Sequence, residues 1–108
     1  MLKLPTYVLI SAARNEARSI EGTIKSVAAQ TVRPLKWVIV SDGSDDGTDD
    51  IVKRYLTQHE WIELLRMPER PERHFAGKVY AFNSGLARVK DIPYEVVVSL
   101  DAGITFDN

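Results

Sequence analysis

The sequence has 108 residues, 44% of them hydrophobic and 27% charged, with a net charge of −1 at pH 7. This balance is typical of one globular domain, or a part of one, and gives no reason to expect a nucleic-acid partner. The absence of cysteine excludes disulfides and thiolate metal sites. Because the sequence shows neither a signal peptide nor an apolar run of ~20 residues, we expect a cytoplasmic location; membrane association would come only from other parts of a longer protein.

Four short apolar runs predict β-strands, at residues 7–11, 37–41, 62–66 and 95–100. The runs Val38–Val40 and Val96–Val98 are continuous and β-branched, which is typical of strands buried on both faces of a parallel sheet. Residues 62–66 are more polar and are expected at an edge of the sheet.

Apolar residues at helical spacing predict three helices between these strands. The stripes are Ile20, Ile24, Val27 and Ala28; Ile51, Val52, Tyr55 and Leu56; and Val79, Phe82, Leu86 and Val89. Thr48 is the expected cap of the second helix, and residues 67–77 are expected to form a loop. The alternation of strands and helices predicts an α/β fold, a Rossmann-like parallel sheet with helices on both faces.

The loops that follow the first, second and fourth strands carry acidic groups. They are Ala13–Glu16, Val40–Thr48 and Leu100–Gly103. In a parallel sheet these loops leave the same edge, where open α/β sheets bind ligands. We therefore expect Asp42 and Asp101 to lie in one crevice.

Asp42 directly follows the second strand, and Gly43 permits a sharp turn there. A carboxylate in this place can accept hydrogen bonds from a ribose or a base, or it can bond to its own backbone in a turn; we favour ligand binding. Asp45 and Asp46 do not have the spacing of an EF-hand, so they are expected to shape the turn and the helix start.

The residues after the first strand allow two interpretations. Exposed backbone N–H groups at Asn15 and Glu16 can meet an anionic ligand with help from Arg14, or Asn15 can simply cap the helix. Lys78, next to Gly77, is either a phosphate contact or a solvated lysine. His59 is expected on the apolar face of the second helix, and His59, Trp37 and Trp61 are interpreted as packing residues.

Taken together, these loops resemble the N-terminal half of family 2 glycosyltransferases, which have the nucleotide-sugar-binding GT-A fold. The matching segments are Ile10–Glu16, Ser26–Thr31, Val40–Thr48, Gly77–Gly85 and Ser99–Gly103. The resemblance covers nearly the whole chain and implies the strand order 3-2-1-4. It implies that residues 1–108 are the nucleotide-sugar-binding portion of an incomplete GT-A domain.

The resemblance also implies roles for individual residues. Asp42 would recognise the base of the sugar nucleotide, and Ala13 and Glu16 would line the nucleoside pocket, with Arg14 beside them. Lys78 would lie near the ribose or the pyrophosphate. The donor would be a nucleotide-diphosphate sugar and the acceptor an unidentified hydroxyl group, with inversion at the anomeric carbon.

A divalent ion is implied by the same resemblance. Asp101 matches the first acid of the family's Asp-x-Asp signature, whose second acid binds Mg²⁺ or Mn²⁺; this chain has Gly103 there. Asp101 is therefore the metal ligand we expect, with reduced affinity; a neighbour such as Asp107 could replace the missing acid, or the site could work poorly. The family's catalytic base and acceptor site lie beyond the matching segments, so we expect the isolated chain to bind nucleotide weakly and to transfer no sugar. Apolar edges of an incomplete sheet would favour dimerisation.

Two other function classes remain open at this point. A sugar-phosphate nucleotidyltransferase would carry a glycine-rich loop after the first strand, and this chain has none there. A degenerate, non-catalytic nucleotide-sugar-binding module would fit the replacement at Gly103. A dinucleotide-dependent dehydrogenase is disfavoured because Gly-x-Gly-x-x-Gly is missing.

Overall fold

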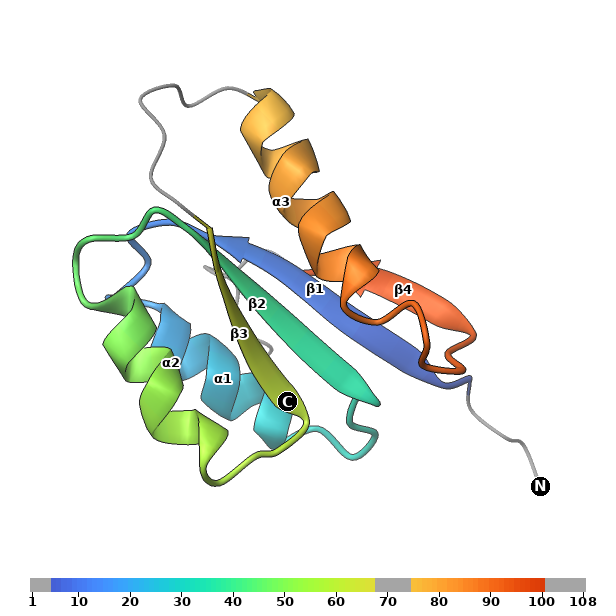
Figure 1. The fold of residues 1–108 in the computed structure, drawn as a ribbon. Helices are drawn as coiled ribbons and strands as arrows, with labels where there is room; N and C mark the ends of the chain where they lie inside the picture. The colour runs from blue at the N-terminus through green and yellow to red at the C-terminus, as the bar shows by residue number, and fades with distance from the viewer. Residues whose placement is uncertain (1–4, 68–74, 101–108) are drawn as a thin grey trace.

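The computed structural model describes residues 5–67 and 75–100, with the backbone alone at 75–78. Strands and helices alternate along the chain (Figure 1). The strands are β1 (Tyr7–Ala13), β2 (Lys36–Asp42), β3 (Ile62–Met67) and β4 (Val96–Ser99). The helices are α1 (Ile20–Ala28), α2 (Thr48–Leu56) and α3 (Phe75–Ala87). No helix within the described ranges is both long and apolar enough to cross a membrane.

The four strands form one parallel sheet in the order β3-β2-β1-β4. This confirms the predicted α/β class and strand order. It also confirms that the more polar strand β3 lies at an edge. The central pair is in register from Val8 beside Lys36 to Ala13 beside Ser41.

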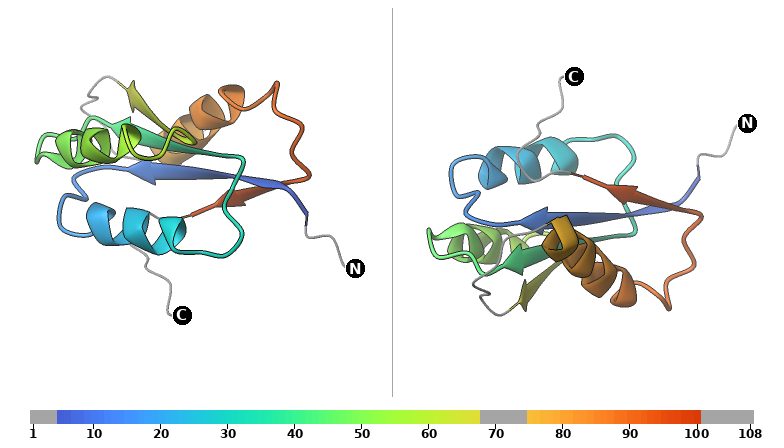
Figure 2. Two further views of the ribbon diagram at one scale, coloured as in Figure 1. Left: turned by 90° about the horizontal axis from the view of Figure 1, so that it is seen from below. Right: turned by 90° about the horizontal axis from the view of Figure 1, so that it is seen from above.

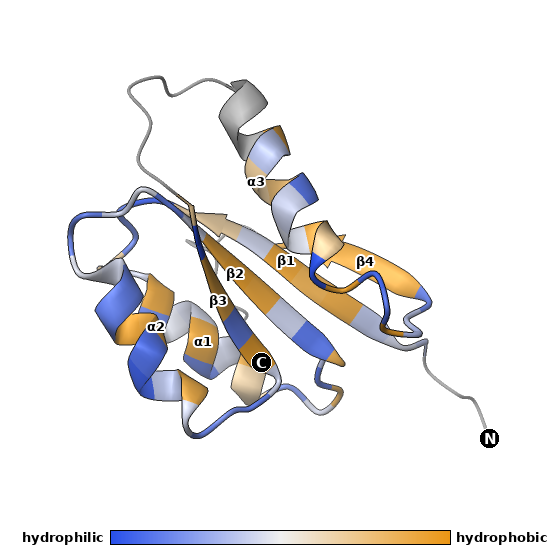
Figure 3. Cartoon of the chain, in the orientation of Figure 1, coloured by the Kyte–Doolittle hydropathy of each residue, from blue (hydrophilic) through white to orange (hydrophobic). Residues whose placement is uncertain are grey.

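Helices cover both faces of the sheet, as Figure 2 shows, with α1 and α2 on one side and α3 on the other. Alternate side chains of each strand therefore enter different cores. In β1, Leu9 packs towards α1 and α2, whereas Val8 and Ile10 pack towards α3. Hydropathy follows the same division, because apolar residues line the sheet and the polar residues of α2 lie away from it (Figure 3).

The expectation that Val96–Val98 is buried on both faces is wrong for this structure. β4 pairs with β1 along one side and forms an edge of the four-stranded sheet. Val97 packs beside Val8 on the α3 side, but Val96 and Val98 are 42% and 37% exposed on the opposite side. A continuous β-branched run thus specified a strand without specifying its place in the sheet.

Aromatic residues pack where β2 and β3 begin. Trp37 is fully buried, and its indole Nε1–H donates to Ser11 Oγ at 2.9 Å. Trp61 stacks on Trp37 with ring centroids 6.5 Å apart, and His59 lies between Tyr55 and Trp61. The packing roles predicted for the tryptophans and His59 are confirmed, although His59 lies just beyond α2 rather than within it.

Two helix boundaries differ from the predictions. The N-cap of α2 is Gly47, at φ 95°, and Thr48 is the first residue of the helix. Helix α3 begins at Phe75, inside the predicted loop 67–77. Val79 is 43% exposed and therefore does not belong to the buried stripe of α3, whereas Ala81 is 1% exposed. Loop composition and apolar spacing are both ambiguous near a helix end, which explains these errors.

Gly85 allows α3 to lie close to the sheet. A Cβ atom at this position would stand 2.7 Å from Ile10 Cγ2 and 3.0 Å from Val40 Cγ2. Both of those side chains belong to the core beneath α3, so neither has free space to move into. The missing side chain therefore sets the distance between α3 and the strands β1 and β2.

We predict that Gly85→Ala lowers the free energy of unfolding by about 1–3 kcal/mol, because overpacking outweighs the gain of up to about 1 kcal/mol in helix propensity. Urea unfolding measures the change. Asn83→Ala, at an exposed position of the same helix, is the matched control and should be neutral or slightly stabilising. A Gly85→Ala protein as stable as the Asn83→Ala protein would contradict this account.

Candidate functional site

The carboxyl ends of three strands lie at one edge of the sheet. Ala13, at the end of β1, is the register partner of Ser41 near the end of β2. The backbone N–H of Leu100 donates to the carbonyl of Ile10 at 3.0 Å, which places the end of β4 beside the same part of β1. The predicted convergence of the three strand ends is thus confirmed, while Asp101, Gly103 and the side chain of Lys78 lie outside the described residues.

Asp42 is the last residue of β2 and is 9% exposed. It pairs with Met67, and the neighbouring residues Val38 and Val40 on alternate positions of β2 pack under α3. Strand alternation therefore directs Asp42 to the α3 face of the sheet edge. Gly43 follows at φ 74°, which confirms the predicted sharp turn.

The loop after β1 also turns sharply at this edge. Ala13 is buried in the core beneath α1 and α2, so contact between this residue and a nucleotide would involve its backbone. Arg14 follows with an exposed side chain. Asn15 then takes a left-handed backbone conformation at φ 54°, which asparagine tolerates better than most residues.

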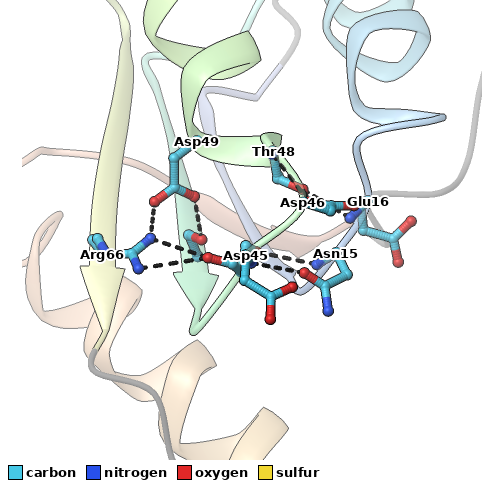
Figure 4. Close-up of polar contacts among 9 residues, drawn as sticks. Asn15, Glu16, Asp45, Asp46, Thr48, Asp49 and Arg66 are labelled. Carbon is cyan, nitrogen blue, oxygen red and sulfur yellow. Dashed lines mark hydrogen bonds and ion pairs between the residues drawn. The ribbon is translucent and has the colours of Figure 1, made fainter.

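Side chains of the β2–α2 loop and of Thr48, the first residue of α2, accept hydrogen bonds from the backbone of the β1–α1 loop (Figure 4). The N–H groups of Asn15, Glu16 and Ala17 donate to Ser44 Oγ, Thr48 Oγ1 and Asp46 Oδ2 at 3.1, 2.9 and 3.1 Å. In the opposite direction, the N–H of Asp45 donates to Asn15 Oδ1 at 2.9 Å. We call these four hydrogen bonds the loop clasp.

The loop clasp corrects both interpretations of Asn15 and Glu16. Helix α1 begins only at Ile20, with Ser19 as its N-cap, so Asn15 does not cap it. The N–H groups proposed for an anionic ligand already have protein acceptors. The Glu16 carboxylate accepts a hydrogen bond from Ser19 Oγ at 3.0 Å. The N–H groups of Asn15 and Glu16 thus donate to the side chains of Ser44 and Thr48, in a distant part of the sequence, and not to a ligand.

Asp46 has a central position in this arrangement. Its Oδ1 accepts from the backbone N–H of Thr48 at 3.1 Å and from the Thr48 hydroxyl at 2.5 Å. The bond from that hydroxyl lowers the pKa of the Asp46 carboxyl; partial burial opposes the shift, and the N–H groups of Ala17 and Thr48 add to it. The prediction that Asp46 shapes the turn and the helix start is confirmed.

Sequence reasoning missed a second polar network next to the site. Asp49, in the first turn of α2, accepts a hydrogen bond from Ser41 Oγ and forms an ion pair with Arg66 at the end of β3 (Figure 4). Asp49 and Arg66 belong to the lining of a shallow depression of about 300 Å³, together with Ser44, Asp45, Gly47, Asp50 and Lys53. The pairing of Ser41 with Arg66 in the sheet creates the network, and no local sequence signal reports that register.

The described residues offer little to a metal ion. Within residues 5–67 and 75–100, no group of three or more histidine or acidic side chains lies close enough together to hold a metal ion. Asp101, the ligand expected from the resemblance, lies outside the described residues, so its role stays a prediction.

A comparison with family models matches residues 8–106 to Glycosyl transferase family 2. The chain belongs to this family. Among curated proteins, this glycosyltransferase domain is 28% identical over 105 residues to the poly-beta-1,6-N-acetyl-D-glucosamine synthase of Staphylococcus aureus strain COL. The Staphylococcus epidermidis synthase is 29% identical over 101 residues. These alignments cover 97% and 90% of the chain but only 23% and 21% of the relatives.

Solved structures confirm the GT-A fold of the glycosyltransferase domain. The mannosyltransferase PcManGT from Pyrobaculum calidifontis, in complex with GDP-Man and Mn²⁺, superposes with a TM-score of 0.74 at 28% identity. That alignment covers 96% of this chain and 29% of the mannosyltransferase. Residues 1–349 of S. aureus TarS, in complex with UDP-GlcNAc, superpose with a TM-score of 0.67 at 20% identity, over 91% of this chain and 26% of that TarS fragment.

Proposed function

We propose that this domain binds a nucleotide-diphosphate sugar at the carboxyl edge of its sheet and serves a protein that transfers the sugar to a hydroxyl acceptor. The observation that carries the proposal is the buried carboxylate of Asp42 at the end of β2, beside the loop that bears Arg14. Family membership over residues 8–106 supports the same assignment. The mannosyltransferase bound to GDP-Man supports the class of donor.

The chemistry of the edge suits the two ends of such a donor. A carboxylate in the place of Asp42 accepts hydrogen bonds from ring N–H groups, which both uracil and guanine present. Arg14 offers an exposed cation at the end of β1, and Lys78 and Asp101 keep the phosphate-side roles implied by the resemblance. A divalent ion, when bound, would offset the charge that develops on the departing nucleotide. The acceptor hydroxyl would give its proton to the family's catalytic base, beyond the matching segments, while its oxygen attacks the anomeric carbon. The nucleotide diphosphate would leave from the opposite side with the electron pair of the broken bond, so the configuration would be inverted.

A non-catalytic binding module is the second candidate. Gly103 favours it, because the family's second metal-binding acid is absent from that position. Such a module would retain recognition of the base through Asp42 but gain little affinity from a divalent ion. Family membership supports a glycosyltransferase over a nucleotidyltransferase.

Calorimetric titration of GDP, UDP and inorganic pyrophosphate tests the proposal. We expect one of the two nucleotides to bind with a Kd on the order of 1 mM or lower, and pyrophosphate to bind more weakly because it has no base. Repeating the titrations with Mn²⁺ separates the two candidates: tighter binding supports the transferase, and unchanged binding supports the module. No binding of either nucleotide under both conditions would overturn both.

A further inference from the structure

The loop that carries Arg14 depends on the loop after Asp42 for its backbone hydrogen bonds. The N–H groups of Asn15, Glu16 and Ala17 follow a strand end and precede a helix, so neither element provides their acceptors. They are satisfied by side chains 29 to 32 residues away in sequence. A buried backbone N–H group without an acceptor costs free energy. Removing one of these acceptors should therefore change the backbone conformation of residues 15–17, because the N–H group would seek another partner.

Asp46 and Thr48 form the centre of that dependence. The Thr48 hydroxyl donates to Asp46 Oδ1 and accepts from the N–H of Glu16. It therefore links the Asp46 carboxylate to the backbone of the β1–α1 loop. Asp46 Oδ2 meets the next N–H, that of Ala17, directly. Thr48 is fully buried, which leaves its hydroxyl no alternative partner in solvent.

We propose that Asp46 is a positioning residue of the nucleotide site: together with Thr48, it holds the loop that bears Arg14 against the loop that follows Asp42. This inference rests on the proposed function. Asp46 acts through Thr48 and through the backbone of Ala17, so its effect on a nucleotide is indirect. If both loops are already fixed before the nucleotide binds, the free energy of binding does not include the entropy cost of ordering them.

Two substitutions test this role through different atoms. In Asp46→Asn, an amide that keeps its oxygen on Thr48 turns its NH₂ group towards the N–H of Ala17, so two donors face each other. Thr48→Val removes the hydroxyl from a buried side chain of nearly equal volume. We expect each variant to bind the preferred nucleotide, GDP or UDP, about tenfold more weakly than the unaltered protein, and to shift the amide NMR signals of Glu16 and Ala17.

Matched variants separate positioning from a general loss of structure. Thr48→Ser keeps the hydroxyl and should restore both the affinity and the Glu16 amide signal. Asp50→Asn removes the same charge from an exposed side chain in the first turn of α2 that makes none of the bonds of the loop clasp, and should bind nucleotide normally. All titrations are made at a temperature at which circular dichroism shows each variant to be folded.

The possible outcomes distinguish this inference from the proposed function. Normal nucleotide affinity in folded Asp46→Asn and Thr48→Val proteins would overturn the positioning role alone. Failure of Thr48→Ser to restore affinity would also overturn it, because the hydroxyl would then not be the transmitting group. If the unaltered protein binds neither nucleotide, the proposed function fails first and the positioning role fails with it.

Discussion

Replacing Asp42 by asparagine is expected to weaken nucleotide binding by about 10- to 100-fold. A hydrogen bond to a charged group contributes about 1.5–3 kcal/mol, and each 1.4 kcal/mol corresponds to a factor of ten in Kd. Asparagine has nearly the same shape as aspartate, so the buried end of β2 can keep its backbone course. Calorimetric titration of GDP and UDP measures the loss.

The control for this prediction lies in the same loop. Asp45→Asn removes one negative charge from an exposed side chain and leaves the end of β2 untouched. If electrostatic repulsion of the diphosphate dominated, both variants would bind nucleotide more tightly. If the carboxylate recognises the base, only Asp42→Asn loses affinity, and an unchanged Kd in that variant would remove the main support for the proposed site.

The largest loss of stability is expected from Trp37→Ala. Removing a fully buried tryptophan costs about 3–5 kcal/mol, because the transfer free energy is lost and a cavity remains. The substitution also deprives Ser11 Oγ of its indole donor inside the sheet. Since a domain of this kind has a total stability of about 5–15 kcal/mol, the variant should be close to unfolding. Urea denaturation followed by circular dichroism checks the prediction.

Trp61 provides a comparison within the same aromatic stack. It is only half-buried and lies against Arg33 on its outer side, so Trp61→Ala should cost clearly less than Trp37→Ala. Trp37→Phe keeps most of the packing and removes the indole N–H. Its loss of unfolding free energy should lie between those of Trp61→Ala and Trp37→Ala. Equal losses at Trp37 and Trp61 would show that burial does not govern stability here.

Much of the fold was predictable from local pattern. The apolar runs at residues 7–11, 37–41 and 62–66 each lie within an observed strand, and the run 95–100 contains β4. Such runs report strands because burying a pleated segment needs consecutive apolar side chains. The edge position of β3 also followed from its polarity.

The site was only partly predictable. Sequence reasoning placed Asp42 and Arg14 at the carboxyl edge of the sheet because parallel strands end together. It missed Asp49 and Arg66, whose ion pair depends on the register between β2 and β3. It also left Asn15 as a possible helix cap, although that side chain accepts from Asp45 in another loop.

The sequence by itself therefore determined the elements, their alternation and the edge at which the polar loops emerge, because these properties arise from neighbouring residues. Only the tertiary structure decided which groups satisfy the N–H groups of Asn15, Glu16 and Ala17. Their acceptors come from the other loop once β1 and β2 pair in one register. Hydrogen bonds between distant segments depend on that register, which local periodicity does not encode.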